Sequence, residues 1–206
     1  MPLLRRSVLA TMAALPLLPG SAFAQATAPA VDPKLGERAA GNADAKVVVH
    51  EWFSLTCSHC AEFQKTTFPQ VKKQLIDTGR VRYVWRDYPL DQVALAAAAV
   101  ARALPPERYE PFITTLLATQ NRWAFTRGVN SIEEIAKVAA LAGMPRQAFD
   151  AAVNDTAVKQ AIIAAQDEAE KKLGINSTPS FLFNGKLVSG AISFATFKQS
   201  VDTAVG

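Results

Sequence analysis

Residues 47–60 read VVVHEWFSLTCSHC, an apolar run that ends in a Cys-x-x-Cys motif. β-branched and aromatic residues fill the run, which predicts a buried strand. Apolar residues at helical spacing follow the motif: Phe63, Phe68, Val71 and Leu75. Cys57 is therefore expected at a helix N-terminus, where unpaired backbone N–H groups and the helix dipole favour a thiolate over a thiol. Since thiolates attack disulfides, the pattern indicates redox chemistry on thiols.

Two other roles for Cys57 and Cys60 have to be weighed against redox chemistry. A closed zinc site needs four ligands, and the chain holds two cysteines and two histidines, His50 and His59. His59 lies between the cysteines and is badly placed to bind the same ion. His50 is directed to the strand face opposite that of Glu51, so it is badly placed as well. A structural disulfide would close a very short loop and stabilise the fold little. We therefore expect no metal site, and no cofactor other than the redox-active disulfide Cys57–Cys60.

The first 24 residues have the pattern of a cleaved signal peptide. Arg5 and Arg6 supply positive charge, residues 8–18 are apolar, and Ala22-Phe23-Ala24 matches a small-x-small cleavage pattern. The apolar run is short and contains proline, which argues against a membrane anchor. The paired arginines leave both the Sec and the twin-arginine routes open. We expect an exported, periplasmic protein.

The formal charge excludes little. The whole chain has 22 basic and 18 acidic residues, and loss of the signal peptide leaves 20 basic residues against 18, a formal charge of +2. This balance, without a basic cluster that contains aromatic residues, gives no reason to expect a nucleic-acid partner. The remaining chain is long enough for one domain with a sizeable core.

Hydrophobic periodicity divides the rest of the chain into an α/β part and a helical part. Strands are predicted at 46–54, 81–85, 180–183 and 186–188, and helices at 58–76, 93–104, 109–119, 131–141, 145–153, 155–173 and from 193. The first strand–helix–strand unit implies parallel pairing with a right-handed crossover. Residues 25–45 are interpreted as a flexible N-terminal arm. Residues 91–170 are interpreted as a helical domain inserted between residues 46–90 and 171–206.

The chain resembles the bacterial DsbA-type thiol:disulfide oxidoreductases of the thioredoxin superfamily. The likeness is carried by Cys-Ser-His-Cys at 57–60 after a strand, by the helical insertion and by Ser177-Thr178-Pro179 before a hairpin. It implies an α/β, thioredoxin-like fold, a central mixed sheet flanked by helices with an inserted all-helical domain. The family usually has Pro-His between the cysteines. Ser58 in place of that proline affects the expected redox potential and leaves the redox class unchanged.

The resemblance also implies a role for each residue of the site. Cys57 would be the nucleophile, Cys60 the buried resolving thiol, and His59 a side chain that stabilises the Cys57 thiolate. Thr178 and Pro179 would form the cis-proline segment beside the sulfurs. The backbone of Thr178 could then pair with an extended substrate strand, which would give affinity without sequence selectivity.

Glu51 lies inside the apolar strand, six residues before Cys57. An ionised carboxylate is costly to bury, so the pKa of Glu51 should rise. In the family, an acidic residue at this place relays protons for the buried cysteine. The alternative is an edge-strand glutamate that faces solvent. Arg86 and Asp87, which follow the second strand, could rim the site.

The favoured function is an exported dithiol oxidase. It would oxidise reduced exported protein clients, would be reoxidised by a quinone-linked membrane partner of the DsbB kind, and would act as a monomer. An isomerase or reductase of the same fold stays open. DsbC/DsbG-type isomerases have an N-terminal dimerisation domain, and the roughly 20 residues between the signal peptide and the first strand argue against one here, although a threonine before the cis-proline is common in that branch. An oxidoreductase dedicated to one client, a thiolate metal carrier and a redox-inert chaperone stay open too.

Overall fold

The computed structural model describes residues 32–205, and the predicted signal peptide (residues 1–24) lies outside them. The strands are β1 (Arg38–Ala40), β2 (Val47–Phe53), β3 (Val81–Asp87), β4 (Ser180–Phe183) and β5 (Lys186–Ser189). The helices are α1 (Ser58–Thr66), α2 (Phe68–Val71), α3 (Gln92–Ala103), α4 (Pro106–Ala118), α5 (Ser131–Leu141), α6 (Arg146–Val153), α7 (Thr156–Leu173) and α8 (Phe194–Ala204). A 3-10 turn, η1 (Pro33–Leu35), and two π-helical turns, η2 (Lys72–Ile76) and η3 (Asn121–Phe125), complete the described part.

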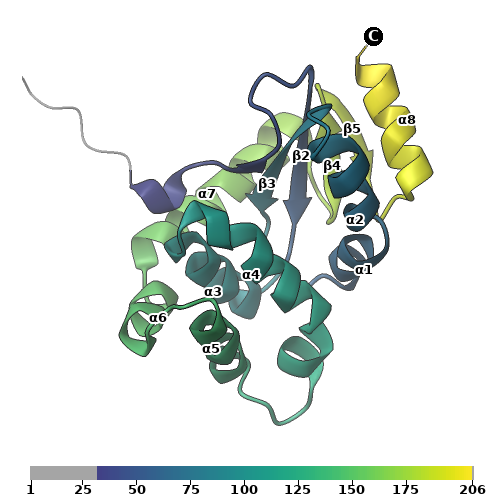
Figure 1. Cartoon of the computed structure of the whole chain (residues 1–206). Helices are drawn as coiled ribbons and strands as arrows, with labels where there is room; N and C mark the ends of the chain where they lie inside the picture. The colour runs from purple at the N-terminus through teal and green to yellow at the C-terminus, as the bar shows by residue number, and fades with distance from the viewer. Residues whose placement is uncertain (1–31, 206) are drawn as a thin grey trace, which may run out of the picture. The chain divides into compact units, whose positions relative to one another are not determined.

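A mixed five-stranded sheet in the order β1-β3-β2-β4-β5 forms the centre of the fold (Figure 1). β2 pairs in parallel with β3, β4 runs antiparallel to β2, and β5 runs antiparallel to β4. The predicted strand–helix–strand unit and the hairpin are thus confirmed. Asn184 and Gly185, at the hairpin turn, both have positive φ angles, as such tight turns require. Among residues 32–205, no helix is long and apolar enough to cross a membrane.

Residues 33–40 are structured, and the prediction that they belong to a flexible arm (residues 25–45) is wrong for this stretch. Arg38–Ala40 form β1, which pairs antiparallel with β3, and η1 contacts α3 and α7. The side chain of Arg38 is buried and donates a hydrogen bond from Nη2 to the carbonyl oxygen of Arg102 at 2.9 Å. A three-residue strand at the edge of a sheet is too short to show an alternating apolar pattern. The composition of residues 25–45 therefore gave no sign of this strand.

The helix predicted over residues 58–76 covers the right range but is interrupted. α1 ends at Thr66, and α2 begins at Phe68 with Pro69 in its first turn. Proline has no N–H to donate to the preceding turn, and its ring clashes with the carbonyl there. The chain then continues through α2 into the π-helical turn η2.

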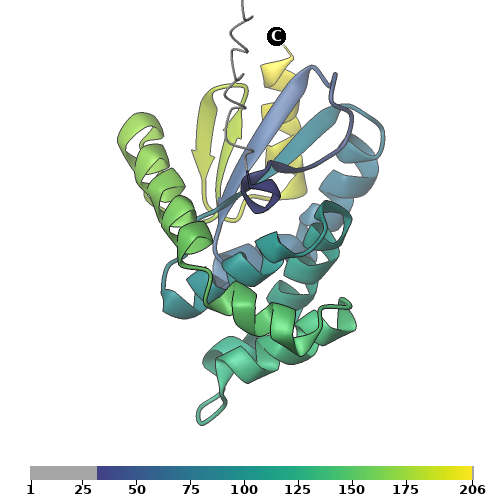
Figure 2. The same ribbon diagram turned by 90° about the vertical axis from the view of Figure 1, so that its left-hand side faces the viewer.

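Helices cover both faces of the sheet. On one face, Phe63 of α1, Phe181 of β4 and Phe197 of α8 pack together, with ring centroids 4.6–6.2 Å apart. On the other face lies α7 (Figure 2), whose buried Ala169 packs with Trp52 of β2. This arrangement confirms the expected α/β fold with helices on both sides of a mixed sheet.

The helices α3 to α6 lie beside the end of the sheet where β2 and β3 finish (Figure 1). Their buried side chains, for example Phe112 and Ile135, belong to the same hydrophobic core as Val49 of β2. α7 begins against α3 and ends on the sheet. The predicted domain boundary at residue 170 therefore falls inside a helix, and the insertion shares its core with the sheet.

Candidate active site

Cys57 is the N-cap residue of α1 and directly follows the loop after β2. Its backbone is extended, and its carbonyl oxygen accepts the N–H of Ala61 at 3.1 Å. The N–H groups of the first helical turn have no acceptor within the helix and are free to face the Cys57 sulfur. Both thiols are free and buried, with Cys57 7% and Cys60 1% exposed, whereas Ser58 and His59 between them are exposed.

The surroundings of Cys57 favour its thiolate. A hydrogen bond from the Cys60 thiol contributes most, followed by Thr178 and by the backbone N–H groups of Cys60 and His59, and together they lower the pKa of Cys57 to about 5 against the effect of burial. The thiolate predicted at the helix N-terminus agrees with this arrangement. His59 contributes through its backbone, and in residues 32–205 its ring makes no hydrogen bond to the sulfur. A role for the His59 ring stays a prediction.

Cys60 has the opposite character. Burial raises the pKa of its thiol well above the ordinary range, and the hydrogen bond to Cys57 and the charges of Glu51 and Cys57 raise it further. A backbone hydrogen bond from Ser54 acts in the other direction but is the smallest effect. At neutral pH the reduced pair therefore consists of one thiolate, at Cys57, and one thiol, at Cys60.

The Thr178–Pro179 segment lies beside the sulfur of Cys57. Its peptide bond is cis, as expected, and the Cys57 thiol donates a hydrogen bond to the carbonyl oxygen of Thr178, with Sγ and O 3.3 Å apart. Within the described residues, the buried Thr178 hydroxyl has no hydrogen-bond partner. It is thus available to donate to the Cys57 thiolate once the thiol proton has left. Ser180, the first residue of β4, pairs with Trp52 and holds the segment next to the end of β2.

Glu51 is buried beneath this pair, with 3% of its surface exposed. It lies on β2, a central strand between β3 and β4, so the alternative of an exposed edge-strand glutamate is wrong. The hydroxyl of Tyr83 donates a hydrogen bond to Glu51 Oε2 at 2.8 Å. Burial raises the pKa of Glu51 to about 7, although the Tyr83 hydrogen bond acts against that rise.

Two residues of the site were not found from the sequence, Gln120 and Tyr83. Gln120 follows α4 and is 4% exposed, and its Nε2 donates to the carbonyl oxygens of Leu55 at 2.8 Å and Cys57 at 3.0 Å. It ties the active-site loop to the helical insertion. A single polar residue after an apolar helix, or a tyrosine within a strand, is too common a pattern to have indicated either contact.

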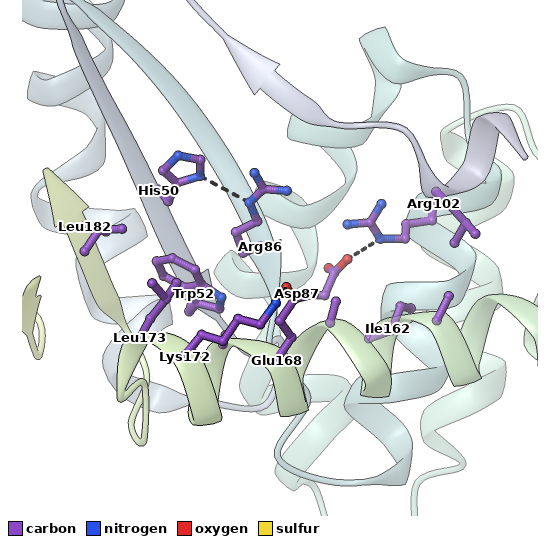
Figure 3. A pocket seen from close by; sticks show the side chains of 14 residues that line it. His50, Trp52, Arg86, Asp87, Arg102, Ile162, Glu168, Lys172, Leu173 and Leu182 are labelled. Carbon is purple, nitrogen blue, oxygen red and sulfur yellow. Dashed lines mark hydrogen bonds and ion pairs between the residues drawn. The ribbon is translucent and has the colours of Figure 1, made fainter. Parts of the chain in front are cut away.

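A cavity of about 450 Å³ lies elsewhere, between the sheet and α7 (Figure 3). It is lined by His50, which alternation places on the face of β2 opposite Glu51. Arg86 donates from Nε to His50 Nδ1 at 3.2 Å, and Asp87 pairs with Arg102. Arg86 and Asp87, for which the sequence left a place at the rim of the site open, line this cavity.

The chain is similar to known proteins of thioredoxin-like fold that are named for thiol–disulfide exchange. The family model described as thioredoxin matches residues 34–203. A Rickettsia felis protein named as a protein-disulfide oxidoreductase is 30% identical over 166 residues, which cover 80% of this chain and 59% of that protein. The thiol:disulfide interchange protein DsbA of Pectobacterium carotovorum is 33% identical over 144 residues, 67% of this chain and 66% of the relative. The crystal structure of Wolbachia pipientis alpha-DsbA1 superposes with a TM-score of 0.77 at 27% identity and covers 83% of this chain and 92% of that one. The chain thus spans about three fifths of the length of the Rickettsia relative.

Proposed function

Because the chain belongs to the thioredoxin family, in its DsbA-type branch, we propose that it is an exported thiol:disulfide oxidase that introduces disulfide bonds into other proteins. The observation that carries the proposal is the asymmetry of the cysteine pair. The pKa of Cys57 lies at about 5, and that of Cys60 lies well above the ordinary range. A thiol of low pKa is a good leaving group, and a stabilised thiolate favours the reduced form of the couple. Both properties suit a protein that accepts electrons from client thiols.

The reaction begins from the disulfide form of Cys57 and Cys60. A client thiolate attacks the Cys57 sulfur, which forms a mixed disulfide and breaks the Cys57–Cys60 bond. Cys60 leaves as a thiolate and takes up a proton, since its pKa is raised. The second client thiolate then attacks the client sulfur of the mixed disulfide, and Cys57 leaves as the stabilised thiolate. The client loses two electrons, which the cysteine pair gains.

Glu51 is the proposed source of the proton for Cys60. Its pKa of about 7 means that both the acid and the carboxylate are populated at neutral pH, as proton exchange requires. Its charge raises the pKa of Cys60, which shows that the two groups are electrostatically coupled. No other cofactor is needed in this scheme, because the disulfide itself carries the electrons.

Clients are held by their backbone in this proposal. The Thr178 carbonyl lies 3.3 Å from the Cys57 sulfur, at the beginning of a sheet strand, so an extended client segment can pair there. Pro179 lies next to it and His59 is exposed at the rim. We further propose a periplasmic location, action as a monomer, and reoxidation by a DsbB-like, quinone-linked membrane protein.

The equilibrium of the cysteine pair with a glutathione buffer tests the oxidase function. We expect a couple clearly more oxidising than glutathione. A couple near that of thioredoxin, about −270 mV, would contradict the proposal and would indicate a reductase supplied with electrons. A couple more oxidising than glutathione together with activity on scrambled disulfides would indicate an isomerase. Metal content after purification without chelators, with a thiol titration before and after reduction, tests the metal-carrier alternative.

Two serine variants test the assigned roles of the cysteines. Cys57→Ser should abolish oxidation of a reduced model protein, because the sulfur that the client attacks is gone. Cys60→Ser should retain a reactive Cys57 thiolate that attacks an added client disulfide and accumulates as the mixed disulfide, since the resolving thiol is missing. Nonreducing electrophoresis distinguishes the two outcomes. Oxidation that persists in Cys57→Ser would refute the mechanism.

A further inference from the structure

Tyr83 places a hydroxyl group on the buried carboxyl of the site. The register pairs Val49 with Tyr83 and Glu51 with Trp85, so Tyr83 and Glu51 lie diagonally on the same face of two neighbouring strands. Tyr83 is fully buried, and its Oη lies 2.8 Å from Glu51 Oε2. The contact is therefore built into the pairing of β2 with β3.

The other ionisable groups around this pair are acids. Cys57 and Cys60 of α1 face Glu51 or Tyr83 from one side, and Glu110 of α4 acts on Tyr83 from another. In the part of the chain that the structure describes, no lysine, arginine or histidine lies within ion-pair distance of Glu51, and Tyr83 is its one side-chain hydrogen-bond donor. A Glu51 carboxylate formed here thus has Tyr83 as its stabilising side chain.

The ring of Tyr83 is held in place independently of its hydroxyl. It contacts Phe68 and Trp85 edge-on, with centroids 5.3 Å away in both cases, and stacks on Phe197 at 6.3 Å. A phenylalanine could make the same ring contacts. The hydroxyl of Tyr83 does not contribute to the packing of the ring. Its contact with the site is the hydrogen bond to Glu51.

We propose that Tyr83 is a positioning residue for proton exchange at Cys60, and that its hydroxyl orients the Glu51 carboxyl and stabilises its ionised form. The inference rests on the proposed function, since the exchange accompanies departure of the Cys60 sulfur. In that step the Cys60 thiolate and the Glu51 acid become the Cys60 thiol and the Glu51 carboxylate. The Tyr83 proton stays on its oxygen and shifts no charge.

The substitution Tyr83→Phe tests this role. Loss of a hydrogen bond to an ionised group should move the Glu51 titration to higher pH by about 1–2 units. We would follow it by the infrared carboxyl signal that disappears in Glu51→Gln. The pH profile of single-turnover exchange with a reduced peptide should move in the same direction. If Tyr83→Phe does not fold, fluorotyrosine at position 83 replaces it as the test. Its hydroxyl is a stronger hydrogen-bond donor, so the Glu51 titration and the pH profile of exchange should both move to lower pH.

Tyr109→Phe is the matched control. Tyr109 is equally buried, contacts Trp85, and donates its hydroxyl to a different carboxylate, that of Asp87, at 3.0 Å. This variant should lose stability but keep the wild-type Glu51 titration and pH profile. An unchanged titration in Tyr83→Phe, or an equal shift in both variants, would overturn the inference. Failure of the wild-type protein to exchange disulfides would instead refute the proposed function, because the infrared titration needs no activity.

Discussion

Cys57 and Cys60 lie one helical turn apart, yet their surroundings drive their protonation in opposite directions. Cys57 receives hydrogen bonds from the helix N-terminus and from Cys60, which stabilise a negative charge. Cys60 is more deeply buried, keeps its proton, and donates a hydrogen bond to the Cys57 thiolate. It also faces the charge of Glu51. Each residue thus depends on the other, since the donor for one thiolate is the thiol of its neighbour.

This dependence predicts the effect of two substitutions at Cys60. Cys60→Ala removes the largest contribution to the lowered pKa of Cys57 and should raise that pKa from about 5 toward its ordinary value. Cys60→Ser keeps a hydroxyl donor and should raise it less. The pH dependence of iodoacetamide alkylation at Cys57 measures both. Midpoints that stay near 5 in both variants would mean that the Cys60 thiol does not stabilise the Cys57 thiolate.

Burial of Glu51 has a cost in stability that depends on pH. Its pKa is raised from 4.5 to about 7 in the folded protein, so folding favours its protonated form, and stability is lost as the pH rises from 4.5 through 7. Glu51→Gln removes this dependence. Between pH 4 and pH 8 the free energy of unfolding of the variant should gain about 3 kcal/mol relative to wild type. Urea denaturation of both proteins in the disulfide form, in which no thiol titrates, checks this. In that form the contribution of the Cys57 charge to the raised pKa of Glu51 is absent, so the gain should be somewhat smaller. A constant difference across this range would contradict the raised pKa.

At the scale of elements, Gln120 of the helical insertion supports the active-site loop. Gln120, just after α4, donates to two carbonyl oxygens of the loop between β2 and α1. A loop that precedes a catalytic helix N-terminus must hold its backbone geometry, because the N–H groups act on the sulfur over short distances. The insertion therefore contributes to the chemistry as well as to the surface around it.

Gln120→Leu should reveal this contribution. The Leu55 carbonyl would lose its donor inside the protein, which should lower the free energy of unfolding by about 1–3 kcal/mol. The rate of thiol–disulfide exchange should fall as well. Gln64→Leu is the control, since Gln64 is a buried glutamine that links α1 to Thr114 of α4 without touching the loop. It should lower stability and leave the exchange rate unchanged. Equal rate losses in the two variants would contradict a specific role for Gln120.

At the scale of the whole molecule, the redox state is coupled to global stability. The folded pKa of Cys57, about 5, lies below its ordinary value of about 8.5. Its thiolate therefore stabilises the reduced protein fully above the ordinary pKa, and this stabilisation is lost as the pH falls through 5. The disulfide spans only two intervening residues and adds little by restricting the unfolded chain.

Reduced protein should thus melt at a higher temperature than oxidised protein at pH 7, and the difference in Tm should shrink as the pH is lowered to 5. Glu51 titrates in both forms and largely cancels from the comparison. Differential scanning calorimetry of the two forms over this pH range makes the measurement. A Tm difference that stays constant, or favours the oxidised form at pH 7, would show that Cys57 is not a stabilised thiolate.

Local sequence accounts for most of the framework. The apolar run before Cys57, the Asn184-Gly185 turn and the helical spacing of apolar residues act over a few positions, so strands, helices and the position of the Cys-x-x-Cys motif could be predicted from them. Thr178-Pro179 was interpretable through family resemblance. The strand β1 was missed because its three residues become a strand only when β3 offers an edge to pair with.

The protonation states of the site residues, and the contacts that hold these residues in place, could be assigned only from the tertiary structure. That Glu51 is buried follows from the position of β2 between two other strands, and that Tyr83 reaches Glu51 follows from the register of β2 with β3. Gln120 lies 63 positions from Cys57 in the chain, and folding brings them within 3.0 Å. Electrostatic and hydrogen-bonding effects of this kind depend on distance and desolvation in space. Patterns along a chain record neither, so the sequence could predict the reacting residues and only the packed structure could assign their protons.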